Sequence, residues 1–238
     1  MENRILSTRP YEPSDFDRYI QTTLPYVHDF YQQTLSMIRE YGNTEGKLLD
    51  LGCGTGMLEK LLRDAFPNIS LEGIDPSPEM LHIAEQKQIA DVVFRPGTSQ
   101  ELQAEKEYDI ITAIEVHHFL QPSERKQVVA NIYRALNDGG IYICFENIIP
   151  ADEDLKEHEL NRWQGFQTAA GKTEEEAILH RKRCGIFYFP ITVEEHIGLL
   201  KDAGFRNVYV FWRSYMQMGI MGIRSDAGCS KHSGDPQP

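Results

Sequence analysis

The sequence predicts an α/β protein with a mostly parallel sheet and one reversed strand. Short apolar segments alternate with helical patterns five times along the chain, which is typical of a parallel sheet covered by helices. Two further apolar segments, at residues 208–212 and 215–223, follow each other directly and predict a terminal antiparallel pair. Residues 151–190 interrupt the alternation and predict a helical insertion before the last helix.

Length, charge and cysteine content narrow the class of protein. The 238 residues suit one α/β domain with an insertion. The 36 acidic and 24 basic residues give a net charge of −12, which argues against an extended nucleic-acid surface. The four cysteines show no paired spacing, so structural disulfides are not expected. The chain begins without an apolar signal segment and has no membrane-spanning run, and we expect a cytoplasmic protein without membrane contact.

A glycine-rich turn follows the first expected strand, at residues 47–51. Glycines stand at alternate positions directly after that strand: Gly52, Gly54 and Gly56. Glycine lets the backbone turn sharply and approach a ligand closely, and the helix that follows directs unpaired N–H groups into the turn. Met57 occupies the place of the third glycine in a dinucleotide fingerprint, so another nucleotide is favoured. Asp50 adds a carboxylate at the strand end, which suits a ligand with an ammonium group.

A second carboxylate stands at the end of the next strand. Residues 69–74 form that strand, and Asp75 follows it, 19 residues after Gly56. This spacing is close to the ~20 residues expected for an acid that binds ribose hydroxyls. The two oxygens of a carboxylate match two vicinal hydroxyl donors. We therefore expect Asp75 in a nucleoside-binding site.

The run Leu-Asp-Leu-Gly-Cys-Gly-Thr-Gly at residues 49–56 resembles the nucleotide-binding motif of the class I S-adenosylmethionine (SAM)-dependent methyltransferases. The resemblance implies the Rossmann-like class I methyltransferase fold, with seven strands and one of them antiparallel. After the third strand, Thr98 and Ser99 stand where that family contacts adenine, often through an acid. The resemblance also implies a set of SAM-binding residues around the first two strands: Asp50, Gly52, Cys53, Gly54, Gly56, Asp75 and Pro76.

Candidate catalytic residues follow the fourth and fifth strands. The fourth strand, residues 108–114, leads into Glu115 and the pair His117–His118, at the place where open α/β sheets bind ligands. His117 could orient the substrate or accept a proton, or it could only shape the pocket wall. We expect His118 to be structural. Glu146, at the end of the fifth strand, is the second candidate for proton removal.

A second resemblance is to the carboxy-SAM synthase family, whose members convert SAM to its carboxylated form for tRNA uridine modification. It is carried by segments spread over residues 16–223: Phe16-Asp17, Leu24-Pro25-Tyr26, Ser36-Met37-Ile38, Pro122-Ser123-Glu124-Arg125 and Ala203-Gly204-Phe205. The resemblance implies a ligand contact for Tyr31 and a pairing of Arg183 with the additional carboxylate. There are two departures, because Gly54 replaces a serine of that family and Ile114 an asparagine.

Together these patterns predict three regions and a function. We expect an N-terminal helical cover at residues 1–45, a SAM-binding domain at residues 46–224 with the insertion at 151–190, and a disordered tail at 225–238. The expected function is transfer of a methyl group from SAM to a small molecule, with no metal and with a homodimer as an open possibility. The alternatives are a carboxy-SAM synthase-like enzyme and a non-catalytic protein that binds SAM or S-adenosylhomocysteine.

Overall fold

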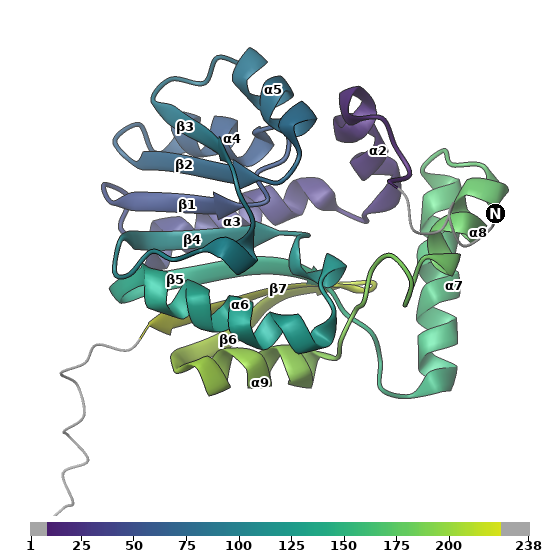
Figure 1. The fold of residues 1–238 in the computed structure, drawn as a ribbon. Coiled ribbons are helices and arrows are strands. Elements are labelled where there is room, and N and C mark those ends of the chain that lie inside the picture. The colour runs from purple at the N-terminus through teal and green to yellow at the C-terminus, as the bar shows by residue number, and fades with distance from the viewer. Residues whose placement is uncertain (1–8, 225–238) are drawn as a thin grey trace, which may run out of the picture.

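Seven strands form one sheet in the order β3-β2-β1-β4-β5-β7-β6 (Figure 1). The computed structural model describes residues 9–224, so the expected tail at 225–238 lies outside the described residues. Strands β1 to β5 are parallel, and β7 runs antiparallel to both of its neighbours, β5 and β6. The predicted mostly parallel sheet with one reversed strand is confirmed. The strands are β1 (Lys47–Leu51), β2 (Ser70–Asp75), β3 (Val92–Pro96), β4 (Tyr108–Ile114), β5 (Leu136–Asn147), β6 (Phe205–Ser214) and β7 (Gln217–Arg224).

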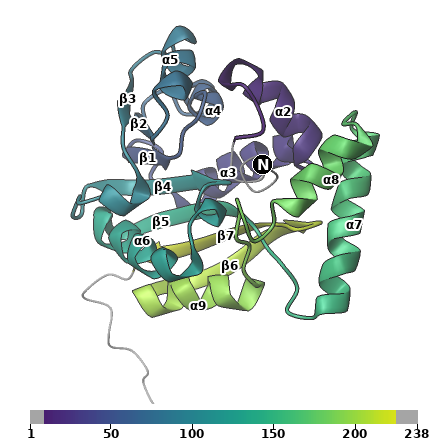
Figure 2. The same ribbon diagram turned by 45° about the vertical axis from the view of Figure 1, so that its right-hand side comes forward.

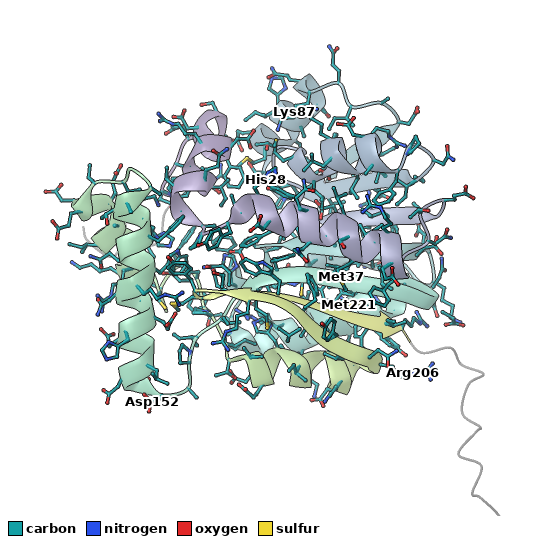
Figure 3. All side chains as sticks on the ribbon, turned by 180° about the vertical axis from the view of Figure 1, so that it is seen from behind. His28, Met37, Lys87, Asp152, Arg206 and Met221 are labelled. Carbon is teal, nitrogen blue, oxygen red and sulfur yellow. The ribbon has the colours of Figure 1, made fainter. Side chains whose placement is uncertain are left out.

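Helices cover both faces of this sheet. Helices α6 (Pro122–Ala135) and α9 (Val193–Ala203) lie in front of it in Figure 1. Helix α3 (Val27–Tyr41) crosses the opposite face, where Met37 lies above Met221 of β7 (Figure 3). Helix α4 (Met57–Ala65) packs on the same face as α3, and α5 (Pro78–Gln86) packs against β2 and β3.

The central strands are apolar on both sides because each side faces a separate core. Ile110 of β4 packs with α3 and α4, whereas its neighbour Ile111 packs with α6. Ile141 and Tyr142 of β5 divide in the same way. Successive side chains of a strand point to opposite faces, so a strand buried on both faces needs an unbroken apolar run.

Two pairs of helices stand over the carboxyl ends of the strands. The first pair is α2 (Phe16–Thr23) and the start of α3, separated at residues 24–26, where Pro25 cannot continue the helix. Tyr26 itself adopts a left-handed conformation with φ 58°. The second pair is α7 (Glu153–Ala169) and α8 (Glu174–Lys182), formed by the predicted insertion. Figures 1 and 2 both show α2 beside α8.

Two strands are longer than the sequence predicts. The apolar run before Glu146, at residues 140–145, predicts only the second half of β5, which begins at Leu136 because Leu136 already pairs with Tyr108 of β4. The strand expected at 208–212 begins at Phe205, which pairs with Arg224 of β7. None of the helices described between residues 9 and 224 has both the length and the apolar character needed to cross a membrane.

Candidate functional site

A cavity of about 430 Å³ lies at the carboxyl ends of β1, β2, β4 and β5, beneath α2 and the insertion. Its volume is in the range of small-molecule sites. All of the predicted site residues line this cavity except Gly56 and Glu146. Those that line it are Tyr31, Asp50, Gly52, Cys53, Gly54, Asp75, Pro76, Thr98, Ser99, Ile114, His117 and Arg183.

The glycine loop, residues 52–56, is hydrogen-bonded to β2 and faces the cavity. The N–H groups of Gly52 and Cys53 both donate to the carbonyl of Ile74, at 2.7 and 3.0 Å. Gly54 has a φ of +54°, and a side-chain carbon added there would meet only Phe16, at 3.8 Å. This glycine therefore leaves the loop backbone accessible to a ligand.

Gly56 serves the turn itself and does not line the cavity. Its φ is +75°, and a side-chain carbon added there would come within 3.1 Å of Ala84 and of Phe94. Its role is thus to let α4 start directly against α5 and β3. Gly56 is absent from the residues that line this cavity, and its contact with the cofactor stays a prediction.

Asp75 joins the glycine loop to the start of α5. One carboxylate oxygen accepts from the Gly54 N–H at 3.0 Å, and the other accepts from the Ser77 N–H at 2.8 Å. Burial raises the pKa of Asp75, although these two N–H groups act in the opposite direction. Asp75 also lines the cavity, where its oxygens have lone pairs left for hydroxyl donors.

Asp50 lies beside the glycine loop at the base of the cavity. It is 3% exposed, and the Thr112 hydroxyl donates to it at 2.5 Å. Burial raises the pKa of the nearby Cys53 thiol and Tyr31 phenol, so both are neutral. Asp50 and Asp75 are therefore the acidic groups that this half of the cavity offers to a cationic or hydroxyl-bearing ligand.

His117 is held by protein groups on both sides of its ring. Its Nε2 lies 3.0 Å from the Ser99 hydroxyl, and its Nδ1 lies 3.1 Å from the Tyr142 hydroxyl. Burial lowers the pKa of His117, so the ring is neutral. With both ring nitrogens engaged, the geometry favours the alternative that His117 shapes the pocket wall.

Glu146 lies behind this wall and does not line the cavity. It is 1% exposed and accepts from the backbone N–H of His117 at 3.1 Å. Burial alone would raise the pKa of Glu146, but the nearby rings of His118 and His117, whose Nδ1 atoms each lie 3.6 Å from a carboxylate oxygen, lower it. A buried carboxylate with a lowered pKa is a weak base, and its position favours a role in fixing His117 and His118.

Arg183 lies both at a helix end and in the cavity. It is the residue that ends α8, and it is 5% exposed. It also lines an adjoining polar pocket between α2 and the insertion, together with Tyr19 and Lys172. Lys172 Nζ stands 4.2 Å from the Tyr19 ring centroid, and burial lowers the pKa of Lys172 to about 8. The sequence did not identify this second, polar pocket.

Several lining residues were not predicted. Glu115 follows β4 in a left-handed conformation with φ 59°, and burial raises its pKa well above the usual value, so that it lines the cavity as a neutral acid. Its place after a buried strand was the only signal that could have identified it. Other unpredicted aromatic side chains come from the insertion and the N-terminal segment: Tyr11, Phe16, Trp163, His180, Phe187 and Tyr188.

Comparison with known proteins agrees with this geometry. Residues 49–142 match a family described as "Methyltransferase domain". A carboxy-S-adenosyl-L-methionine synthase from Campylobacter lari is 29% identical over 196 residues, which span 81% of this chain and 83% of that relative. These matches support the predicted similarity to the class I SAM-dependent methyltransferases. The chain is a transferase of one-carbon groups, and its cofactor is SAM or carboxy-SAM, as predicted.

Solved structures of low sequence identity share the methyltransferase fold. The Haloferax volcanii complex between the Trm112 methyltransferase activator and a putative methyltransferase has a chain that matches with a TM-score of 0.61 and 20% identity, over 90% of this chain and 93% of that chain. Human N-acetylserotonin methyltransferase in complex with SAM matches with a TM-score of 0.56 and 18% identity, over 83% of this chain and 55% of that chain. The predicted Rossmann-like class I methyltransferase fold is confirmed.

The residues of the cavity fit SAM chemically. An open glycine loop allows close backbone approach, Asp50 suits an ammonium group, and Asp75 suits vicinal hydroxyls. The apolar and aromatic side chains beyond them suit an adenine ring and a thioether.

Proposed function

We propose that this methyltransferase transfers a methyl group from SAM to a small-molecule acceptor. The observation that carries the proposal is the cover over the cavity. Trp163 of the insertion donates from its indole N–H to the carbonyl of Thr23 in α2, at 2.7 Å, and both residues are buried. Because this hydrogen bond joins the two covering elements, a small acceptor can be enclosed beneath them more readily than a folded macromolecule can dock there.

The proposed role of each residue in binding SAM follows from the position of its side chain. Asp50 and the glycine loop would hold the methionine arm, Asp75 the ribose, and Thr98 and Ser99 the adenine edge. The methyl group on the sulfonium is already electrophilic, so the protein mainly has to align the acceptor with it. The new bond to the acceptor forms as the sulfur–carbon bond breaks, and the electron pair of that bond stays on sulfur.

The acceptor side of the cavity supports the same proposal. Glu115 and Arg183 line it together with the aromatic side chains of the insertion. His117 and Glu146 are poorly placed to remove a proton, as described above, so we assign positioning roles to them. A neutral Glu115 can donate a hydrogen bond to an acceptor, and Arg183 can bind a carboxylate.

A carboxy-SAM synthase-like activity is the second candidate. The sequence similarity to the Campylobacter lari enzyme favours it, as does the position of Tyr31 and Arg183 in the cavity. Two lining residues argue against it, because Gly54 lacks the hydroxyl and Ile114 the amide that the sequence resemblance leads us to expect. We therefore keep methyl transfer as the first proposal.

Mass spectrometry of the ligand released from freshly purified protein separates the candidates. We expect SAM or S-adenosylhomocysteine, and calorimetry should show tighter binding of SAM than of carboxy-SAM. Asp75→Ala should weaken SAM binding by about 1–3 kcal/mol, the scale of a lost buried hydrogen-bonding group. Asp64→Ala, which removes an acid with a 69% exposed side chain on α4, is the matched control and should bind SAM normally.

Other results would point elsewhere. Carboxy-SAM as the released ligand would favour the synthase-like activity. Tight SAM binding without turnover on any panel of small acceptors would favour the non-catalytic alternative.

A further inference from the structure

A second buried acid, Glu59, lies next to Asp50 beneath the glycine loop. It belongs to the first turn of α4 and has no exposed surface. A side-chain carbon added at Gly73 of β2 would stand 2.6 Å from Glu59 Oε1, so the missing side chain at Gly73 provides the space for this carboxyl group. Gly73 is also the residue paired with Asp50 in the parallel register of β1 and β2. The two carboxyl groups therefore share one small volume.

Asp50 and Glu59 have few hydrogen-bonding partners apart from each other. The Thr112 hydroxyl donates to Asp50 Oδ1, and the carboxyl group of Glu59 lies beside Asp50 in the space left at Gly73. Within residues 9–224, no side-chain donor reaches either oxygen of Glu59, and neither acid forms an ion pair. Two ionised carboxylates would be unstable in such a site, because burial and mutual repulsion both oppose the second charge.

The other titratable groups around the pair leave this conclusion unchanged. Cys53 of the loop and Tyr31 of α3 are neutral, and Asp75 of β2 adds negative charge. Lys87, which follows α5, lowers the pKa of Glu59 less than the other groups change it. Its Nζ donates to Asp17 and to Thr55, at 3.1 Å each.

Of the two carboxyl groups, that of Glu59 is the one that stays protonated. Burial, and then the charge of Asp50, raise the pKa of Glu59 well above its usual value. Burial also raises the pKa of Asp50, to about 7, while hydrogen bonds from Thr112 and Glu59 act in the opposite direction. Glu59 therefore keeps its proton over the range in which Asp50 titrates.

We propose that Glu59 is a positioning residue for the cofactor, which as a neutral acid donates a hydrogen bond to Asp50 and holds it ionised for the ammonium group of SAM. The inference rests on the proposed function, since it requires the methionine arm of SAM to lie at Asp50. It assigns to Glu59 the role of a donor rather than that of a second negative charge.

The direction of the expected pH effect follows from linkage. A hydrogen bond to the ionised form of Asp50 lowers the pKa of that carboxyl group, so removing the donor raises it. SAM should bind the protein in which Asp50 is ionised, and affinity should therefore rise with pH up to about 7. Without the donor from Glu59, the same rise should occur at higher pH.

The test is calorimetric titration with SAM between about pH 5.5 and 7.5, below the pKa of an α-amino group at about 7.7–8.0. Wild-type affinity should rise by up to about tenfold per pH unit below pH 7. Glu59→Leu should displace the profile to higher pH and weaken binding about tenfold at pH 7, a displacement of about one pKa unit. Glu59→Gln should rescue the wild-type profile, because its amide N–H replaces the acid O–H as donor. Asp64→Asn, on the exposed side of the same helix, is the control for loss of an acid.

Three outcomes would overturn the inference. The first is a Glu59→Gln variant, folded by its thermal transition, that binds SAM as weakly as Glu59→Leu does, because the charge would then be what matters. The second is a Glu59→Leu profile superimposable on that of wild type. The third, absence of SAM binding by wild type at every pH, would remove the proposed function as well, whereas the first two leave it intact.

Discussion

Arg183 combines two roles that a single substitution can separate. It ends α8, where any cation interacts favourably with the helix dipole, and it lines the cavity. A helix-end role is worth about 0.3–1 kcal/mol, and lysine would serve in it nearly as well. A carboxylate that accepts two hydrogen bonds from the planar guanidinium group would lose this bidentate contact if lysine replaced the arginine.

We predict that Arg183→Lys keeps the melting temperature but loses affinity for a carboxylate-bearing ligand, by about tenfold or more. Calorimetry with carboxy-SAM and with SAM would measure this loss. The control is Arg181→Lys, two residues earlier, whose guanidinium contacts Glu157 and Asn161 of α7 rather than the cavity. If Arg183→Lys binds both ligands as wild type does, the helix-end role is sufficient.

His196 makes stability depend on pH. It lies on α9, is 4% exposed, and burial lowers its pKa to about 4 from the ordinary 6.5. The folded protein thus keeps this ring neutral while the unfolded chain binds a proton, so the free energy of unfolding should fall as pH decreases from about 6.5 to about 4. The lowered pKa values of His118 and His180 act in the same direction.

Urea denaturation should show a loss on the order of 2 kcal/mol from His196 between pH 6.5 and pH 5. His196→Gln should flatten this pH dependence, whereas His158→Gln, at an exposed position of α7, should leave it as it is. An equal slope for wild type and His196→Gln would show that the ring is protonated in the folded state.

Among the helices, α2 and α7 are joined by one buried hydrogen bond. The Trp163 indole N–H is the donor to the Thr23 carbonyl at 2.7 Å, and the Trp163 ring also packs edge-on against His180 and Tyr188. The bond connects elements separated by 140 residues in sequence. It is therefore a feature of the cover rather than of either helix alone.

Trp163→Phe should lower the free energy of unfolding by about 1–3 kcal/mol, because the Thr23 carbonyl is left buried without its donor. It should also speed the release of bound SAM in stopped-flow measurements. Trp212→Phe is a suitable comparison, since the Trp212 ring packs against Phe30 and Phe145 but lies outside the cover. Unchanged SAM release in Trp163→Phe would mean that the cover does not control exchange.

The succession of elements was predictable from sequence, and some of their limits were not. Apolar runs identified the central strands β1, β4 and β5, because strands buried on both faces must be continuously apolar. The starts of β5 and β6 were missed because backbone pairing with a neighbouring strand sets them. Leu136 joins β5 only by pairing with Tyr108, and no pattern in residues 136–139 indicates this.

Site residues at the ends of strands could be predicted from the sequence, whereas residues whose position depends on tertiary packing could not. Asp50 and Asp75 were identifiable because each lies at the end of a strand near the glycine loop. Glu59 resembles any polar residue on a helix, and its burial depends on the space at Gly73 of a different strand. His117 and Glu146 were correctly located along the chain, but the direction of their side chains depends on partners in β5 and after β3.

At the scale of the whole molecule, the cavity is covered by two additions to the sheet. We propose the N-terminal helices and the insertion at 151–190 as one functional unit that encloses the ligand, set on the SAM-binding domain. The polar pocket between α2 and the insertion, with Tyr19 and Lys172, lies where this unit meets solvent.

The strand order has a consequence for the way in which this chain matures. Strand β7 is the last described strand, yet it lies between β5 and β6. Until residues 217–224 have left the ribosome, β5 has a free edge, and the places of Met218, Ile220 and Met221 in the two cores stay empty. A free hydrophobic edge of this kind invites pairing with other chains. The growing chain is therefore most vulnerable to aggregation after β5 has been synthesised and before β7 inserts, an interval in which a chaperone would have most to protect.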